Sequence, residues 1–166
     1  MHRPYDHCPR CGGRLPEGPT WPKRCPSCGR ESYLSPAPVG VTLQPVDDGL
    51  LIIRRGIPPQ RGEWALPGGF IDAYEGWEQG CARELWEETG VRVAPDALTL
   101  FSVENAPEDN MIVIFALAPV MSAADLPPFE VSAECTARAV LHGPEALAFA
   151  LHTLAARRFF DRRSTK

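Results

Sequence analysis

The sequence contains no long apolar segment. Its longest apolar runs, such as residues 111–120, fall well short of the roughly 18 residues that a membrane-spanning helix requires. The N-terminal residues also lack the apolar stretch and the small-residue cleavage site of a secretory signal. From these two absences we expect a cytoplasmic protein that has no membrane partner.

An excess of positive charge is absent as well. The formal net charge is −4 at pH 7, so the chain has no general attraction to nucleic acids or anionic membranes. Hydrophobic residues make up 44% and charged residues 23% of the chain, which is typical of globular proteins and excludes a disordered or fibrous one. With 166 residues, we expect one main domain and a small appendage.

The cysteines are concentrated at the N-terminus. Cys8 and Cys11 form one Cys-X-X-Cys-Gly turn, and Cys25 and Cys28 form a second one. Two such turns present the four thiolates that a closed tetrahedral zinc site requires. The alternative is a pair of disulfides, which would need an oxidising compartment that nothing in the sequence indicates. We therefore predict a structural zinc ribbon.

The charge of this module gives little support to a nucleic-acid partner. Residues 1–36 carry six basic and three acidic side chains, and a zinc ion held by four thiolates would cancel most of the excess. We therefore interpret the ribbon as structural. The proline-containing segment 35–38 is a stiff linker, so we place the domain boundary there, with a zinc ribbon at 1–36 and the main domain at 37–166.

The main domain is predicted to combine strands and helices. Two β-branched and aliphatic segments flank Asp47-Asp48-Gly49 and indicate a β-hairpin. Gly90 suits the end of one helix, and Pro144 suits the first turn of another. The predicted strands are residues 39–46, 50–54, 98–104, 111–118 and 135–141 with a short strand inside 62–70, and the predicted helices are residues 77–89 and 144–160. This order predicts an α+β fold, a mixed sheet packed between helices.

Three carboxylates are expected to share one face of the first helix. Glu84, Glu87 and Glu88 are spaced i, i+3 and i+4, whereas Cys81 and Leu85 fall on a face that can pack against the sheet. Clustered like charges destabilise a helix, and a divalent cation would explain them. Their hard oxygen atoms suit Mg²⁺ or Mn²⁺. The alternative is a solvated acidic face.

The segment around this helix resembles the Nudix box. It has Gly69, five residues, Glu75, seven residues, Arg83-Glu84, an aliphatic residue, one further residue, Glu87-Glu88, one further residue, Gly90 and an aliphatic residue. The resemblance, which we extend over roughly residues 37–160, implies a Nudix α/β/α sandwich and a nucleotide pyrophosphohydrolase.

The resemblance also implies a role for each residue of the box. Glu84, Glu87 and Glu88 would hold catalytic Mg²⁺ or Mn²⁺, with the Gly68 carbonyl as a further ligand, and Glu84 could instead act as the base. Arg83 and Glu75 match the family pair that orients the metal-binding glutamates. The metals would activate a water that attacks one phosphorus, without a covalent enzyme intermediate.

A further carboxylate from a later loop commonly joins the metal site in Nudix enzymes. Glu134, just before the last predicted strand, is the best-placed match, with Glu104, Glu108, Asp109 and Glu130 as competitors.

Two residues before the box are candidates for contacts with the substrate. Arg55 closes the second hairpin strand and is the preferred phosphate ligand over Arg54 and Arg61, while Trp64 could stack on a base.

The zinc ribbon narrows the substrate class. A ribbon followed by a Nudix domain resembles NADH pyrophosphatases and a related group that acts on FAD or ADP-ribose. The first group has a Ser-Gln-Pro-Trp-Pro-Phe-Pro signature after the box, which residues 92–110 lack, so FAD or ADP-ribose is favoured over NAD(H). A capped-RNA hydrolase and a non-catalytic nucleotide sensor are the alternatives, and by analogy with the family we expect a homodimer.

Overall fold

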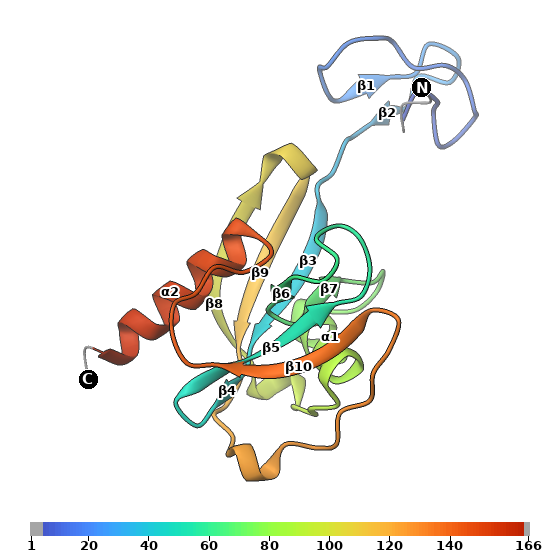
Figure 1. Cartoon of the computed structure of the whole chain (residues 1–166). Helices are drawn as coiled ribbons and strands as arrows, with labels where there is room; N and C mark the ends of the chain where they lie inside the picture. Colours follow the sequence, from blue (N-terminus) through green and yellow to red (C-terminus); the bar gives the residue numbers. More distant parts are fainter. Residues whose placement is uncertain (1–4, 165–166) are drawn as a thin grey trace. The chain divides into compact units, whose positions relative to one another are not determined.

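The computed structural model describes residues 5–164, and the chain divides into two compact units, Met1–Pro36 and Ala37–Lys166 (Figure 1). In the first unit, β1 (Lys23–Arg24) pairs with β2 (Glu31–Ser32) in an antiparallel ribbon. Its small core consists of Cys8, Leu15 and Cys25, with Trp21 packed against them. None of the helices among the described residues is long and apolar enough to cross a membrane.

The second unit contains two β-sheets and two α-helices. One sheet has the order β7-β3-β9-β8, in which β3 and β9 run parallel, and the other has the order β10-β5-β4 with β6 added to β5. The strands are β3 (Ala37–Leu43), β4 (Pro45–Val46), β5 (Gly49–Arg55), β6 (Trp64–Ala65), β7 (Gly68–Phe70), β8 (Thr99–Ala106), β9 (Met111–Leu117) and β10 (Cys135–Leu141). The helices are α1 (Trp77–Thr89) and α2 (Ala150–Ser164), with short 3₁₀ turns η1 (Pro95–Ala97), η2 (Pro107–Asp109) and η3 (Ala123–Asp125).

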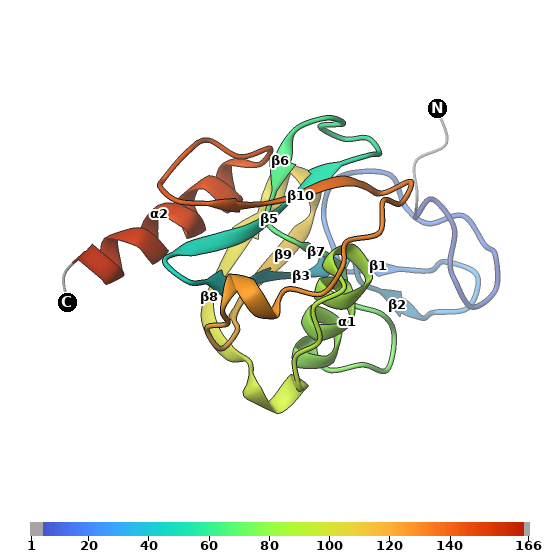
Figure 2. The same cartoon turned by 60° about the horizontal axis from the view of Figure 1, so that its bottom comes forward.

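The main core lies between the two sheets and is closed by α2. Leu43 and Phe115 from the first sheet meet Leu50 from the second, and all three are fully buried. Ala156 and Phe159 of α2 complete this cluster. The two helices lie apart on either side of the strands, with α1 on β3 and β7 (Figures 1 and 2). The α+β class and the mixed sheet are therefore confirmed, although the strands form two sheets rather than one.

Helix α1 has the bounds that the sequence predicts. Cys81 and Leu85 are buried, as expected from their spacing, and Ala82 is buried as well. The helix ends because Gly90 adopts a left-handed conformation (φ 77°), and its N–H donates to the Trp86 carbonyl at 2.8 Å. The strand predictions for 98–104, 111–118 and 135–141 are also confirmed to within two residues at each end.

The first predicted strand, 39–46, was wrong in its extent. The chain leaves one sheet after Leu43 and enters the other at Pro45, so only Pro45 and Val46 form the hairpin with β5. Buried Gln44 fills the step between the sheets, where its Nε2 donates to the Pro45 and Pro119 carbonyls at 2.8 and 2.9 Å. Sequence patterning could not reveal the break, because apolar residues continue on both sides of it.

The predicted closing helix, 144–160, was wrong at both ends. Helix α2 begins only at Ala150, because the preceding backbone is engaged elsewhere, and it runs on to Ser164. The Ala148 N–H donates to the Trp64 carbonyl at 2.7 Å, and the Leu147 N–H donates to the Thr153 hydroxyl at 2.9 Å. Those contacts replace the helical pattern over the segment that follows Pro144.

Candidate active site

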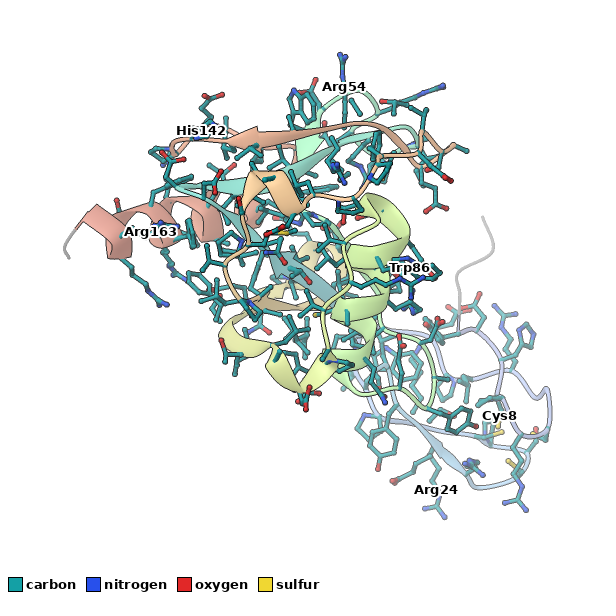
Figure 3. The ribbon with its side chains drawn as sticks, turned by 90° about the horizontal axis from the view of Figure 1, so that it is seen from below. Cys8, Arg24, Arg54, Trp86, His142 and Arg163 are labelled. Atoms are coloured by element: carbon teal, nitrogen blue, oxygen red, sulfur yellow. The ribbon has the colours of Figure 1, made fainter. Side chains whose placement is uncertain are left out.

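The acidic residues of α1 differ in burial. The Glu88 residue is 9% exposed, the Glu84 side chain is 15% exposed and the Glu87 side chain is 48% exposed. Trp86 points away from the sheets on the outer side of the helix (Figure 3), where the Arg92 guanidinium lies 4.3 Å from its ring centroid. The burial of the three carboxylates therefore increases from Glu87 through Glu84 to Glu88.

Arg83 connects three of the predicted site residues. Its Nη2 lies 2.6 Å from Glu75 Oε1, while its Nη1 lies 2.7 Å from Glu84 Oε1 and 3.1 Å from Glu87 Oε2. A further hydrogen bond, from Nη2 to the Phe70 carbonyl at 2.9 Å, ties the guanidinium to the end of β7. The planar guanidinium can satisfy several acceptors at once, which an ammonium group cannot do with fixed geometry.

Glu75 is the strongest partner of this guanidinium. The hydrogen bond from Arg83 lowers the pKa of Glu75, and the Asp72 N–H adds a second hydrogen bond to the same carboxylate at 2.7 Å. Glu75 is therefore held ionised and fixed in the loop before α1. It can orient Arg83 and, through Arg83, the carboxylates of Glu84 and Glu87.

Glu88 is held against the glycine turn. Its Oε2 accepts the Gly68 N–H at 2.7 Å. Burial raises the pKa of Glu88 to about 7, and the Gly68 N–H and the Cys135 thiol offset part of that effect by hydrogen bonding. Burial also raises the pKa of Glu84. Both groups therefore sit in an environment that a cationic ligand would stabilise in their charged forms.

Two glycines allow the turn to approach both β3 and α1. A Cβ on Gly68 would lie 2.3 Å from the Gly40 carbonyl oxygen, and a Cβ on Gly69 would lie 2.5 Å from Glu84 Oε2. Any side chain at position 69 would thus occupy the space of the Glu84 carboxylate. The predicted role of the Gly68 carbonyl as a metal ligand stays a prediction.

Glu134 lies in the loop before β10, near the helix carboxylates. After the larger effect of burial, the negative charges of Glu87 and Glu134 raise the pKa of Glu84 further. The Glu134 backbone is fixed, because its carbonyl accepts the Gly56 N–H at 2.6 Å. The competitor Glu104 pairs instead with Arg158 on α2. The predicted role of Glu134 as an additional metal ligand stays a prediction.

Burial raises the pKa of Glu88, and the positive charge of Arg55 offsets a small part of that rise. The Arg55 Nε donates to the Pro59 carbonyl at 2.8 Å, and its guanidinium carbon lies 5.1 Å from the Phe149 ring centroid. The adjacent Arg54 points to the outer face of the sheet (Figure 3). Trp64 is partly buried against the main core, so its predicted role in base stacking stays a prediction.

The four N-terminal cysteines converge on one point. Their sulfur atoms all lie within 4.8 Å of one another, with 3.7 Å between Cys8 and Cys28 and 3.6 Å between Cys11 and Cys25. A tetrahedral zinc ion with Zn–S bonds of about 2.3 Å separates its sulfurs by roughly 3.8 Å, whereas a disulfide brings them to about 2.05 Å. Figure 3 shows Cys8 in this sulfur cluster. The spacing fits zinc, and all four cysteines are free.

The glutamates are not gathered in the same way. Over residues 5–164, the cysteine cluster is the one set of three or more potential metal ligands found within a few ångströms of one another. Arg83 instead contacts Glu75, Glu84 and Glu87, and the Glu87 side chain is half-exposed. The donor set itself, oxygen atoms of carboxylates, fits Mg²⁺ or Mn²⁺.

The two remaining cysteines are buried core residues, as the sequence predicts for Cys81 from its place on the sheet-facing side of the helix. Burial raises the pKa of the Cys81 thiol to about 11 and that of the Cys135 thiol to about 12. Both therefore stay protonated at neutral pH, which argues against a thiolate nucleophile.

Comparison with known proteins identifies the second unit. A sequence model described as the NUDIX domain matches residues 35–162. An ADP-ribose pyrophosphatase from Methanocaldococcus jannaschii is 37% identical over 76 residues, which cover 46% of this chain and 44% of that protein. The NAD-capped RNA hydrolase NudC from Shigella flexneri is 30% identical over 94 residues, which cover 56% of this chain and 36% of NudC. The chain thus matches less than half the length of these curated relatives.

A solved structure extends the similarity to nearly the whole chain. The crystal structure of a NUDIX hydrolase from Nitrosomonas europaea superposes with a TM-score of 0.71 and 25% identity, covering 96% of this chain and 93% of that one.

Proposed function

This chain belongs to the Nudix family of pyrophosphohydrolases, and from that premise we propose that it hydrolyses the diphosphate linkage of ADP-ribose or a similar nucleoside diphosphate derivative. The observation that carries the proposal is the arrangement around Arg83. One guanidinium contacts Glu75, Glu84 and Glu87, while Glu88 is fixed one turn away against Gly68. A solvated acidic face would not need this organisation.

We assign metal binding to the helix carboxylates. Glu84, Glu87 and Glu88, with the Gly68 carbonyl and Glu134, would hold Mg²⁺ or Mn²⁺, which when bound neutralises diphosphate oxygens and lowers the pKa of a water molecule. Arg83 and Glu75 act as positioning residues. The hydrogen bonds of Arg83 to Glu75 and to the Phe70 carbonyl would hold the guanidinium in place independently of Glu87.

The remaining steps belong to side chains around the substrate. Arg55 would donate to a phosphate oxygen, a bidentate contact that suits a guanidinium. Glu84 is partly desolvated, and its raised pKa suits it to accept a proton from the attacking water, as an alternative to metal binding. The phosphate on the far side of the attacked phosphorus then leaves, without a bond to the protein.

The zinc ribbon is proposed as a separate structural domain. Residues 1–36 would bind Zn²⁺ through Cys8, Cys11, Cys25 and Cys28, and residues 37–166 would form the catalytic domain. In the family context, we also propose a homodimer in the cytoplasm; light scattering after size-exclusion chromatography tests the oligomeric state.

A second candidate substrate is NAD-capped RNA. The supporting observation is the similarity to NudC over 94 residues. Opposing it, the Ser-Gln-Pro-Trp-Pro-Phe-Pro signature expected of the NADH group is missing after the box. Capped-RNA hydrolysis that depends strongly on salt concentration would favour this substrate, because contacts with a polyanionic chain are weakened by salt.

The experiment that tests the proposal is hydrolysis of a substrate panel with Mg²⁺ or Mn²⁺. The panel contains ADP-ribose, FAD, NAD, NADH, diadenosine polyphosphates and NAD-capped RNA, and wild type is compared with Glu87→Gln. Cleavage of ADP-ribose to AMP and ribose 5-phosphate that Glu87→Gln abolishes is the expected result. Tight nucleotide binding by the wild type without turnover of any compound would overturn the hydrolase proposal in favour of a nucleotide sensor.

A further inference from the structure

The chain crosses from one sheet to the other beside the proposed metal site. β6 belongs to the sheet of β5, β7 belongs to the sheet of β3, and only Leu66 and Pro67 separate them. Pro67 has no N–H, and its carbonyl accepts the Thr42 N–H at 2.9 Å. The Leu66 N–H therefore needs an acceptor from outside the two ladders, since a buried backbone donor without a partner is costly.

His152 supplies that acceptor from α2. The Leu66 N–H donates to His152 Nδ1 at 3.2 Å, across 86 positions of sequence. The imidazole is buried, with ring centroids 5.9 Å from Phe115 and 5.0 Å from Phe149, so its orientation is fixed by packing. Burial also lowers the pKa of His152 to about 3, which keeps the ring neutral and its Nδ1 lone pair available at physiological pH.

The same short segment is held from the other side by α1. Gly68 follows Pro67 directly, and its N–H is bound by Glu88 at 2.7 Å. The segment of three residues is thus anchored at Leu66 by His152 and at Gly68 by Glu88, with Pro67 limiting its backbone freedom. Any shift of Leu66 is transmitted to Gly68 and to the carboxylate that contacts it.

We propose that His152 is a positioning residue for the metal site: by fixing the Leu66–Gly68 crossing, it sets the place of Gly68 and Glu88. The inference rests on the proposed function, because it takes Glu88 as a metal ligand. Groups that hydrogen-bond to metal ligands commonly change metal affinity about 10- to 100-fold when they are removed. His152 acts one step further out, through the backbone.

Four variants of the zinc-loaded full chain test this inference, and one of them, Glu88→Gln, tests the metal site itself. His152→Leu keeps a similar volume without an acceptor, and His152→Asn keeps an oxygen near the position of Nδ1. Phe159→Leu is the matched control, because Phe159 is buried on the same helix in the main core. Mn²⁺ binding is measured from the electron paramagnetic resonance signal of free Mn²⁺, so no substrate is needed.

We expect the dissociation constant for Mn²⁺ to rise about 10-fold in His152→Leu and to stay near the wild-type value in His152→Asn and Phe159→Leu. Equal weakening in His152→Leu and Phe159→Leu, or no rescue by Asn, would overturn the inference. If Glu88→Gln weakens Mn²⁺ binding but His152→Leu does not, only the role of His152 fails. If Glu88→Gln binds Mn²⁺ like the wild type, the proposed metal site itself fails.

A measurement on the wild type does not depend on how the variants fold. In ¹⁵N NMR spectra at neutral pH, His152 should show the neutral tautomer with the proton on Nε2 and an unprotonated Nδ1 that accepts a hydrogen bond. A proton on Nδ1 would overturn the inference, because that nitrogen could not then accept the Leu66 N–H.

Discussion

Gly69 offers a direct test of the site, because the Glu84 carboxylate lies where a side chain at position 69 would extend. In Gly69→Ala, the new Cβ would lie 2.5 Å from Glu84 Oε2, about 0.9 Å short of the 3.4 Å at which ordinary van der Waals contact begins. The carboxylate must retreat by that amount or give up its 2.7 Å contact with Arg83. A displacement of about 1 Å at a reacting group costs roughly 100-fold in rate.

We therefore expect kcat/KM for ADP-ribose hydrolysis in Gly69→Ala to fall by about two orders of magnitude. The fold should survive, because the colliding atoms are the end of a flexible side chain and not backbone. Steady-state kinetics at saturating Mn²⁺ and thermal unfolding by circular dichroism measure the two effects separately. Gly143→Ala is the matched control, because a Cβ there meets nothing within 4 Å. Activity of Gly69→Ala near that of Gly143→Ala would refute the placement of Glu84.

Three further predictions follow from the charges and ligands. Replacing Arg83 by Lys keeps the positive charge but removes the planar guanidinium that contacts three glutamates. We expect kcat to fall about 10- to 100-fold with an unchanged unfolding midpoint, and kinetics equal to those of the wild type would contradict the positioning role. Removing zinc with a chelator should abolish hydrogen-exchange protection of backbone amides in residues 8–29, and retained protection would argue against a zinc-dependent ribbon. Burial lowers the pKa of His152 to about 3. The contribution of the neutral imidazole to the free energy of unfolding is therefore fully present above about pH 6.5. As the pH falls from there towards 3, this contribution is lost by up to about 1.4 kcal/mol per pH unit. Urea titrations should show that the wild-type free energy of unfolding falls relative to His152→Asn between pH 6 and pH 4, and a constant difference would be inconsistent with a neutral buried imidazole.

Local patterns allowed α1 and the cysteine cluster to be predicted from the sequence. The i, i+3, i+4 spacing of the glutamates and Gly90 at the helix end depend on residues within one or two turns. The two Cys-X-X-Cys-Gly turns are equally local, since each glycine adopts a left-handed conformation immediately after its second cysteine, with φ 71° at Gly12 and 72° at Gly29. Features of this kind need no knowledge of distant contacts.

The contacts that the sequence did not reveal join residues far apart in the chain. The crossing at Gln44 and the late start of α2 are set by partners 75 and 84 positions away, Pro119 for Gln44 and Trp64 for Ala148. His152 falls inside the predicted helix 144–160, and the local sequence does not show which group its imidazole contacts. Only the crossing between β6 and β7, seen in three dimensions, shows which backbone donor it satisfies.

We propose that the carboxylates of α1 support metal-dependent hydrolysis of a nucleoside diphosphate derivative. The most direct test of this proposal is release of AMP from ADP-ribose, followed by ³¹P NMR at saturating Mn²⁺, in wild type, Glu88→Gln and Glu78→Gln. Glu78 lies in the first turn of the same helix and serves as the control for a lost negative charge. We predict AMP release by wild type and by Glu78→Gln, and its loss in Glu88→Gln. Release by Glu88→Gln at the wild-type rate would contradict the account.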